Sequence, residues 1–186
     1  MNIKKITIKQ VKEIYNQYIV EDFPINERRP LNKIIKLINN NKYIAYALFN
    51  QDILLGYAFF YGYDNQFICD YFAIVKEYRN QNYGSFFLQE LLKLFSTSKL
   101  YFEVEKPENP NKSIKERRIQ FYLKNNIVLN PIHIRLFFVD YIILSNTPTT
   151  LEEVKHLYQK LYNRFAYNQY IEFKWEDTSH FIFVIL

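Results

Sequence analysis

The sequence predicts a single α/β domain with a mixed sheet that contains both antiparallel and parallel strand pairs. Its 186 residues match the usual size of one domain, and 49% of them are hydrophobic, which is enough to form a core. Two apolar runs joined by a short polar turn predict an antiparallel hairpin. Further along, a strand, a loop, a helix and a second strand predict a βαβ unit, whose two strands pair in parallel.

The first third of the chain is typical of two helices followed by the hairpin. Thr7 can cap a helix whose apolar residues recur at helical spacing and which should end before Pro24. A second helix is expected over residues 31–38, before a run of three asparagines. The apolar runs 43–49 and 53–61 then form the hairpin.

The middle of the chain carries the βαβ unit. Residues 66–74 are an almost unbroken apolar run, as expected for a central strand with both faces covered. A polar loop follows, and a helix with an apolar stripe begins at Gly84. Residues 100–105 are again strand-like, so the crossover should be right-handed.

The remaining segments complete the sheet and add a C-terminal extension to a core of about residues 1–145. A helix is expected over 113–124 and strands over 132–138 and 139–144. Thr150 and Glu153 form a capping box ahead of a helix over 150–165. Residues 166–186 stay unassigned. Their alternating apolar side chains can add strands to the sheet edge or to a neighbouring subunit, which leaves a homo-oligomer open; they are Ile171, Phe173, Trp175, Phe181, Phe183 and Ile185.

The composition excludes several classes of protein. Six Pro and three Gly are too few for collagen or for Gly/Pro-rich disorder. The net charge of +5 is spread along the chain with no run of four basic residues, so a nucleic-acid partner is not favoured. The apolar stretch 43–63 is interrupted by Asp52, whose burial at mid-bilayer costs about 2.5 to 3.5 kcal/mol. No secretory signal follows the basic N-terminus, so we expect a cytoplasmic protein without a membrane segment.

Neither a metal site nor a disulfide is predicted. The three histidines are far apart in the sequence and belong to no His-Glu-x-x-His or Cys-x-x-Cys pattern. The single cysteine, Cys69, lies in an apolar run and is expected to be a small buried side chain.

The stretch from Ile68 to Leu88 resembles the acetyl-CoA-binding motif of the GNAT superfamily of N-acetyltransferases, a strand followed by Arg/Gln-x-x-Gly-x-Gly/Ala at the start of a helix. Arg79 and Gly84 match the ends of the motif, and Asn82 replaces its first glycine. A helix N-terminus offers free amides and about half a positive charge, so it can hold a pyrophosphate. The residues expected to bind the cofactor are Phe72, Ala73, Ile74, Arg79, Asn80, Gln81, Asn82, Tyr83, Gly84 and Ser85.

A second stretch is similar to a later part of the same family. Tyr101-Phe-Glu-Val-Glu resembles the family's strand "LEV", and the segment beginning at Arg118 resembles its helix "A-I-x-x-Y-E-x-x-G-F". Lys115 stands where many members carry a pantetheine-binding Asn, and Asn126 replaces the glycine. Together the matches span about residues 44–144. They imply a GNAT-like fold, with a mostly antiparallel central sheet, one parallel splayed strand pair and flanking helices.

The resemblance implies that acetyl-CoA is the co-substrate and that a primary amine attacks its thioester directly in a ternary complex. In this scheme the pantetheine lies along the strand near Phe72, and the amide of Ile74 polarises the thioester carbonyl. Tyr122, at the family's tyrosine position, would protonate the leaving thiolate, or it only packs in the core. The acceptor stays open among a peptide N-terminus, a polyamine and an amino sugar.

A base is needed because a protonated amine has no lone pair, and the apolar strands offer Asp70, Glu103 and Glu105. Glu103 is preferred because it matches a glutamate of some peptide N-terminal acetyltransferases, and Asp70 is the reserve. In the alternative interpretation these carboxylates are held in ion pairs, with partners expected among Arg117, Arg118 and Lys106. The rival function is a non-catalytic, acyl-CoA-binding or regulatory module with the same fold. A third possibility is a module that binds a protein or a nucleic acid without any cofactor. Only the net positive charge of the chain supports it.

Overall fold

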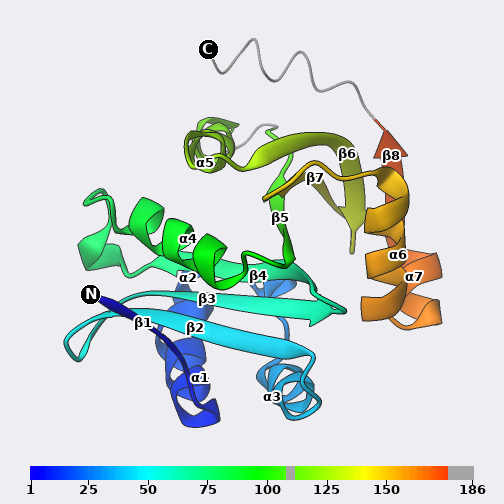
Figure 1. The fold of residues 1–186 in the computed structure, drawn as a ribbon. Helices are drawn as coiled ribbons and strands as arrows, with labels where there is room; N and C mark the ends of the chain where they lie inside the picture. Colours follow the sequence, from blue (N-terminus) through cyan, green and yellow to red (C-terminus); the bar gives the residue numbers. More distant parts are fainter. Residues whose placement is uncertain (108–111, 176–186) are drawn as a thin grey trace. The chain divides into compact units, whose positions relative to one another are not determined.

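The computed structural model describes residues 1–107 and 112–175, and within them it shows an eight-stranded mixed sheet (Figure 1). The strands follow the order β1-β2-β3-β4-β5-β7-β6-β8, and β4 and β5 are parallel, which confirms the predicted fold class. The strands are β1 Asn2–Lys5, β2 Tyr43–Asn50, β3 Ile53–Tyr63, β4 Gln66–Ile74, β5 Lys99–Glu105, β6 Val128–Leu136, β7 Val139–Ser145 and β8 Ile171–Trp175. The α-helices are α1 Ile8–Ile14, α2 Val20–Asp22, α3 Leu31–Asn39, α4 Tyr83–Leu94, α5 Lys112–Lys124, α6 Leu151–Leu161 and α7 Arg164–Tyr170.

The chain divides into two compact units, and β4 contributes to both. The first unit holds residues 1–62 and 69–96, and the second holds residues 63–68 and 97–186. No helix in the described part of the chain is long and apolar enough to cross a membrane.

In the first unit, an antiparallel sheet lies between α1 and α3 on one face and α4 on the other (Figure 1). Alternation along β3 produces this arrangement, because neighbouring side chains point to opposite faces. Tyr57 meets the ring of Tyr18 at 6.2 Å between centroids, whereas Phe60 meets Phe95, which follows α4, at 4.8 Å. Both faces of the strand are therefore buried in aromatic packing.

The first predicted helix begins and ends as expected but is not uniformly α-helical. Thr7 caps it in a reciprocal capping box with Gln10. A π-helical turn over Tyr15–Ile19 joins α1 to α2, and the helix ends at Asp22, before Pro24. β1 was not predicted, because the strand has only four residues and most of them are exposed. They show no clear alternation of apolar and polar side chains.

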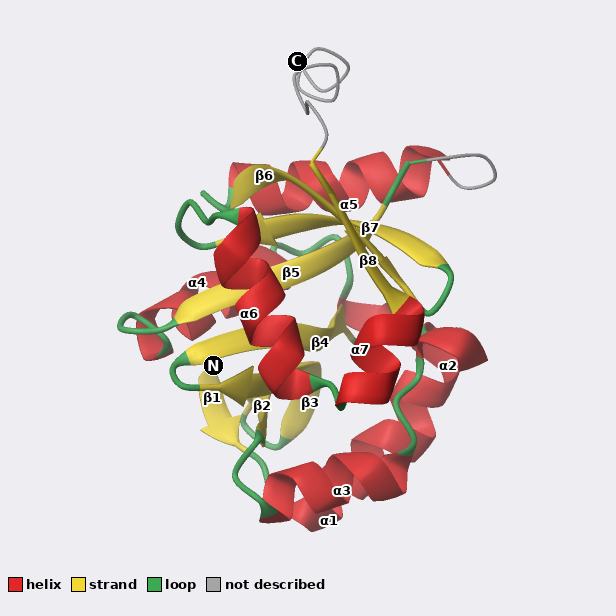
Figure 2. Cartoon of the chain, turned by 90° about the vertical axis from the view of Figure 1, so that its right-hand side faces the viewer, coloured by secondary structure: helices red, strands yellow, loops and turns green. Residues whose placement is uncertain are grey.

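In the second unit, β5, β7, β6 and β8 are antiparallel neighbours. Helices α5 and α6 cover opposite faces of these strands (Figure 2). The strand expected over 132–138 is displaced toward the N-terminus, since β6 spans Val128–Leu136. Phe137 and Phe138 instead form a two-residue turn with φ of 47° and 70°. Two consecutive phenylalanines are typical of a strand, which is why the prediction extended to 138. In the structure Leu136 pairs with Val139, so the two phenylalanines between them lie at the tip of the hairpin.

The capping box of Thr150 and Glu153 is confirmed at the start of α6. The helix ends at Leu161 instead of 165, because the side chain of Asn163 accepts a hydrogen bond from the amide of Ala166 and starts a second helix. β8 pairs antiparallel with β6, so the expected addition to the sheet edge is confirmed for Ile171–Trp175. The predicted positions 176–186 lie outside the described residues.

Candidate functional site

The turn after β4 and the start of α4 contain most of the predicted cofactor-binding residues. After a 3₁₀ turn over Lys76–Tyr78, Asn80 and Asn82 each adopt φ of 62°. This left-handed conformation favours glycine and tolerates asparagine, so Asn82 keeps the backbone shape of the glycine that it replaces. Asn82 is the N-cap of α4, and its side chain makes no capping hydrogen bond. The amides that open the helix are therefore not occupied by that side chain.

The backbone around Ile74 has a defined orientation. The amide of Val75 donates to the carbonyl oxygen of Leu55 in β3 at 2.9 Å. A trans peptide points its C=O and N–H in opposite directions, so the Ile74 carbonyl points away from β3. The Ala73 carbonyl lies against β3, where a Cβ at Gly56 would be 2.8 Å from its oxygen. The Ile74 N–H, which belongs to that peptide, therefore also points away from β3.

Arg79 connects this backbone to the end of α2. Its Nε donates to the Ile74 carbonyl oxygen at 2.8 Å, and its Nη2 donates to Oδ1 of Asp22 at 2.5 Å. The hydroxyl of Tyr57 donates to the other carboxylate oxygen of Asp22 at 2.8 Å. Burial, followed by the hydrogen bond to Asp22, raises the pKa of Tyr57 well above that of an ordinary phenol, so this tyrosine stays a donor.

Two further predicted residues have identified partners in the same unit. The ring of Phe72 stacks on Phe87 of α4 at 5.5 Å, which attaches the strand to the helix. The amide side chain of Gln81 donates to the carbonyl of Glu77 at 3.3 Å and so closes the turn on itself.

Asp70, the reserve base, lies in a charged and aromatic cluster. Arg29 donates to its two carboxylate oxygens at 2.6 and 3.1 Å, and the hydroxyl of Tyr43 donates at 2.8 Å. The backbone amide of Arg29 donates to Tyr71, and its guanidinium lies 4.6 Å from the centre of the Tyr61 ring. Burial, and next the charge of Asp70, raises the pKa of Tyr43. Asp70 is thus held in an ion pair, as in the alternative interpretation, but its partner is Arg29 and not one of the three expected cations. The pair ties the segment before α3 to β4.

The predicted acid and the preferred base lie on opposite faces of β5. The ring of Tyr122 in α5 packs 4.7 Å from that of Phe102. Glu103, the next residue of the strand, accepts a hydrogen bond from Tyr158 in α6. Helix α6 lies on the face of these strands opposite α5 (Figure 2). Burial, and next the charge of Glu103, raises the pKa of Tyr158 well above its ordinary value, so the phenol stays protonated and keeps donating.

Glu105 is also paired with a cation, although not with one of the three expected partners. Lys115 Nζ lies 2.6 Å from its Oε2, and about one fifth of each side chain is exposed. The positive charge of Lys115 is thus paired with a carboxylate of β5. Lys115 itself stands at the position where many family members carry an Asn. At the other end of α5, Asn126 adopts φ of 64° and keeps the backbone conformation of the glycine that it replaces.

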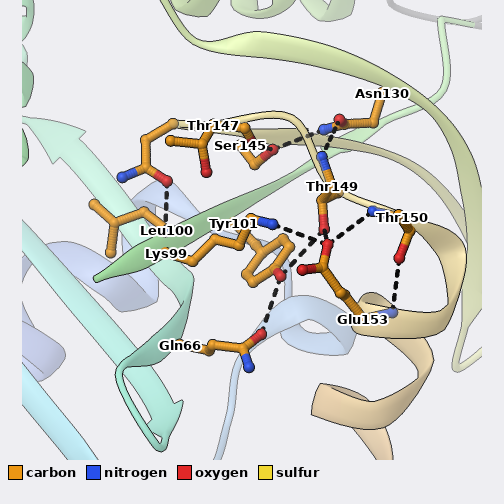
Figure 3. Close-up of polar contacts among 11 residues, drawn as sticks. Gln66, Lys99, Leu100, Tyr101, Asn130, Ser145, Thr147, Thr149, Thr150 and Glu153 are labelled. Atoms are coloured by element: carbon orange, nitrogen blue, oxygen red, sulfur yellow. Dashed lines mark hydrogen bonds and ion pairs between the residues drawn. The ribbon is translucent and has the colours of Figure 1, made fainter. Parts of the chain in front are cut away.

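A polar cluster at the start of α6 was not predicted beyond its capping box (Figure 3). Glu153 accepts hydrogen bonds from Lys99 at 2.9 Å and from Thr149 at 2.8 Å. The hydrogen bond from Lys99, and next the amide of Thr150, lowers the pKa of Glu153 to about 2. Asn130 joins two strands, because its amide donates to Ser145 and to the Ile143 carbonyl. This network has a structural role, because the polar groups shown donate hydrogen bonds to, and accept them from, one another.

Within the described residues, no group of three His, Cys, Asp or Glu side chains could hold a metal ion. Cys69 is buried, as predicted. An open hollow of about 440 Å³ lies along α5, and none of the predicted site residues lines it. Because its walls all come from that one helix, we do not assign it to the reaction; they are Ser113, Glu116, Arg117, Gln120, Phe121 and Lys124.

No protein-family model and no curated protein matches the sequence. Solved structures do match the fold. A Bacteroides thetaiotaomicron protein assigned to the GNAT family of acetyltransferases shares 20% identity, with a TM-score of 0.72 over 89% of this chain and 98% of that one. The Escherichia coli ribosomal-protein-S18-alanine N-acetyltransferase shares 16%, with a TM-score of 0.57 over 81% and 96%. An aminoglycoside 6′-N-acetyltransferase complexed with coenzyme A shares 13%, with a TM-score of 0.57 over 81% and 99%.

The chain therefore has the fold of the GNAT N-acetyltransferases. This likeness agrees with the two motif resemblances, because β4, the following turn and α4 occupy the order that the first motif predicts.

Proposed function

We propose that the protein is an acetyl-CoA-dependent N-acetyltransferase that acts on a primary amine. The observation that carries this proposal is the backbone from Ile74 to α4. Ile74 turns its N–H away from β3, and two left-handed asparagines lead into a helix whose first amides are not capped by the Asn82 side chain. Two of the solved neighbours in fold are complexes with coenzyme A, which supports the same assignment.

The residues of this turn fit a diphosphate. Amides at the start of a helix of twelve residues are donors at the positive end of its dipole. Left-handed residues at positions 80 and 82 turn successive amides toward one side, which is how backbone anion sites are built. Residues 80–85 would hold the pyrophosphate of acetyl-CoA, and Phe72 to Ile74 would lie along its pantetheine.

The proposed reaction is a direct transfer. The lone pair of the amine attacks the thioester carbon, a C–N bond forms, and the C–S bond breaks. The amine gives up one proton, and the leaving thiolate takes one, so the products are an acetylated amine and a free thiol. The Ile74 amide would donate to the carbonyl oxygen as negative charge develops there.

Two side chains are proposed to move protons. Tyr122 would supply a proton to the thiolate, because an ordinary phenol is only about 1.5 pKa units less acidic than an ordinary thiol, so the transfer is only slightly uphill. Glu103 would accept the proton of the amine through water, with Tyr158 holding one of its oxygens. The Tyr122 ring packs on one face of β5, and the Glu103 side chain points to the other face. Tyr122 would therefore serve the thiolate and Glu103 the amine. Asp70 is the weaker candidate, because Arg29 and Tyr43 hold its carboxylate.

Two measurements test this function. Acetyl-CoA should raise the melting temperature of the protein, as any ligand that binds only the folded state does. Free thiol should then appear when acetyl-CoA is incubated with one of three amines, namely a peptide with an N-terminal alanine, spermidine and kanamycin. A melting temperature that acetyl-CoA leaves unchanged would contradict the proposal.

The role of Tyr122 has its own test. Tyr122→Phe keeps the ring that packs on Phe102 and removes only the hydroxyl. We expect kcat to fall about 10²-fold or more, with the dissociation constant of acetyl-CoA nearly unchanged. Turnover equal to that of the wild type would remove Tyr122 from the mechanism.

A further inference from the structure

We propose that Asp22 is a positioning residue for the Ile74 oxyanion donor, which it fixes through Arg79. This inference rests on the proposed function, since Ile74 is a donor only if a thioester lies beside it. It concerns a residue that neither motif contains: Asp22 ends α2, more than fifty residues before Arg79.

The peptide after Ile74 is held at both ends. Its carbonyl oxygen accepts from Arg79 Nε at 2.8 Å, and its N–H donates to the Leu55 carbonyl at 2.9 Å. Because a peptide is planar, two opposed hydrogen bonds fix the orientation of the whole unit. The direction of the neighbouring Ile74 N–H then depends only on the two backbone dihedrals of Ile74, φ and ψ.

These two rotations are restricted from the other side. The Ala73 carbonyl, in the same peptide as the Ile74 N–H, packs against Gly56, where there is no room for a Cβ. The direction of the Ile74 N–H is therefore set by two backbone contacts and one side-chain contact. Of these three, only the contact from Arg79 comes from a side chain.

Arg79 cannot keep this position alone. Its side chain is 44% exposed, and a long exposed side chain gains rotamer entropy when it leaves its partner. Asp22 is 19% exposed and sits between the Arg79 guanidinium and the hydroxyl of Tyr57. The fully buried ring of Tyr57 thus fixes Asp22, and Asp22 fixes Arg79.

The reaction is sensitive to this geometry. An oxyanion donor acts only when its hydrogen lies where the negative charge develops, and a misplacement of about 1 Å costs about 10²-fold in rate. Asp22→Ala leaves Arg79 Nε free to rotate away from Ile74. We expect kcat to fall about 10-fold to 100-fold, while the dissociation constant of acetyl-CoA changes less than about threefold.

The test is the infrared band of the thioester carbonyl in bound acetyl-CoA labelled with carbon-13 at that carbonyl. In the wild type the band should lie at lower wavenumber than in free acetyl-CoA, because a hydrogen bond from Ile74 weakens the C=O bond. Asp22→Ala and Arg79→Met should each reverse at least half of that shift. Asp22→Asn keeps an oxygen that can accept from Arg79, so it should retain more of the shift than Asp22→Ala. Lys93→Met breaks the exposed pair with Glu90 at the far end of α4 and should leave the band in place.

The outcomes separate this inference from the proposed function. If the wild type shows the shift and Asp22→Ala and Arg79→Met show it undiminished, the positioning role is wrong and the transferase assignment stands. A wild type that binds no acetyl-CoA overturns the assignment itself. Circular dichroism and the dissociation constant show whether each variant is folded, and Asp22→Asn provides the comparison if Asp22→Ala does not fold. No acceptor amine is required for this experiment.

Discussion

Gly56 is the residue whose substitution should most directly displace the proposed acetyl site. In Gly56→Ala the new Cβ would lie 2.8 Å from the Ala73 carbonyl oxygen and 2.7 Å from Cδ1 of Ile74. The Ile74 side chain can rotate away, but the carbonyl belongs to the backbone of β4. To reach an ordinary contact of 3.4 Å it must retreat by about 0.6 Å, and the Ile74 N–H moves with it. Overpacking of this kind costs about 1 to 3 kcal/mol of stability.

The assay compares melting temperature with turnover. For a chain of this size, 1 to 3 kcal/mol corresponds to a fall of about 2 to 12 °C in melting temperature. Turnover should fall about 10-fold or more at a temperature where the variant is folded, because the oxyanion donor has moved. Ile34→Val is the matched control: Ile34 is fully buried in α3, outside both β3 and β4, and the change costs about 0.5 to 1.5 kcal/mol. A Gly56→Ala variant with wild-type turnover would refute the reasoning about Ile74.

Three further predictions concern backbone strain and charge. Asn82→Ala should lower the free energy of unfolding by about 1 kcal/mol, whereas Asn82→Gly should leave it equal or higher in urea titrations, because position 82 has φ of 62°. Phe138→Gly should raise the melting temperature, since Phe138 is 75% exposed with φ of 70° in a two-residue turn, and a lower value would contradict the strain argument. The pKa of Glu153 is lowered to about 2, so its contribution to stability is complete above its usual value of 4.5 and is lost as the pH falls toward 2. Glu153→Gln should therefore reduce the loss of melting temperature between about pH 5 and about pH 2, by a small amount because the side chain is 48% exposed.

Local signals predicted the elements that have them. The central strand was placed at its observed bounds, because nine residues of nearly continuous apolar character have few other interpretations. Thr150 was recognised as a helix cap from the glutamate three positions later, and Thr7 from the helical spacing of the apolar residues that follow it. The end of α6 was wrong by four residues because an apolar stripe continues across the break, and only the cap by Asn163 reveals it.

The partners of the candidate site could not be predicted in the same way. Asp70 meets Arg29 and Glu103 meets Tyr158 across 41 and 55 residues, and no periodicity encodes such distances. The pairing of Arg79 with Asp22 has the same origin. What the sequence does indicate is the need for partners, because a carboxylate in an apolar strand is costly unless it is paired.

The two asparagines that replace motif glycines bear on the rival function, a non-catalytic module. That interpretation takes the loss of glycine as a sign that the motif no longer serves the cofactor. Asn82 and Asn126 adopt φ of 62° and 64°, the conformation for which glycine is usually required. Asparagine is among the residues that reach this region most easily, so both replacements preserve the backbone path. A motif that keeps its backbone also keeps its amide donors, and the proposed phosphate site consists of backbone amides. The replacements therefore do not favour a module over an enzyme, and the choice depends on whether thiol is released.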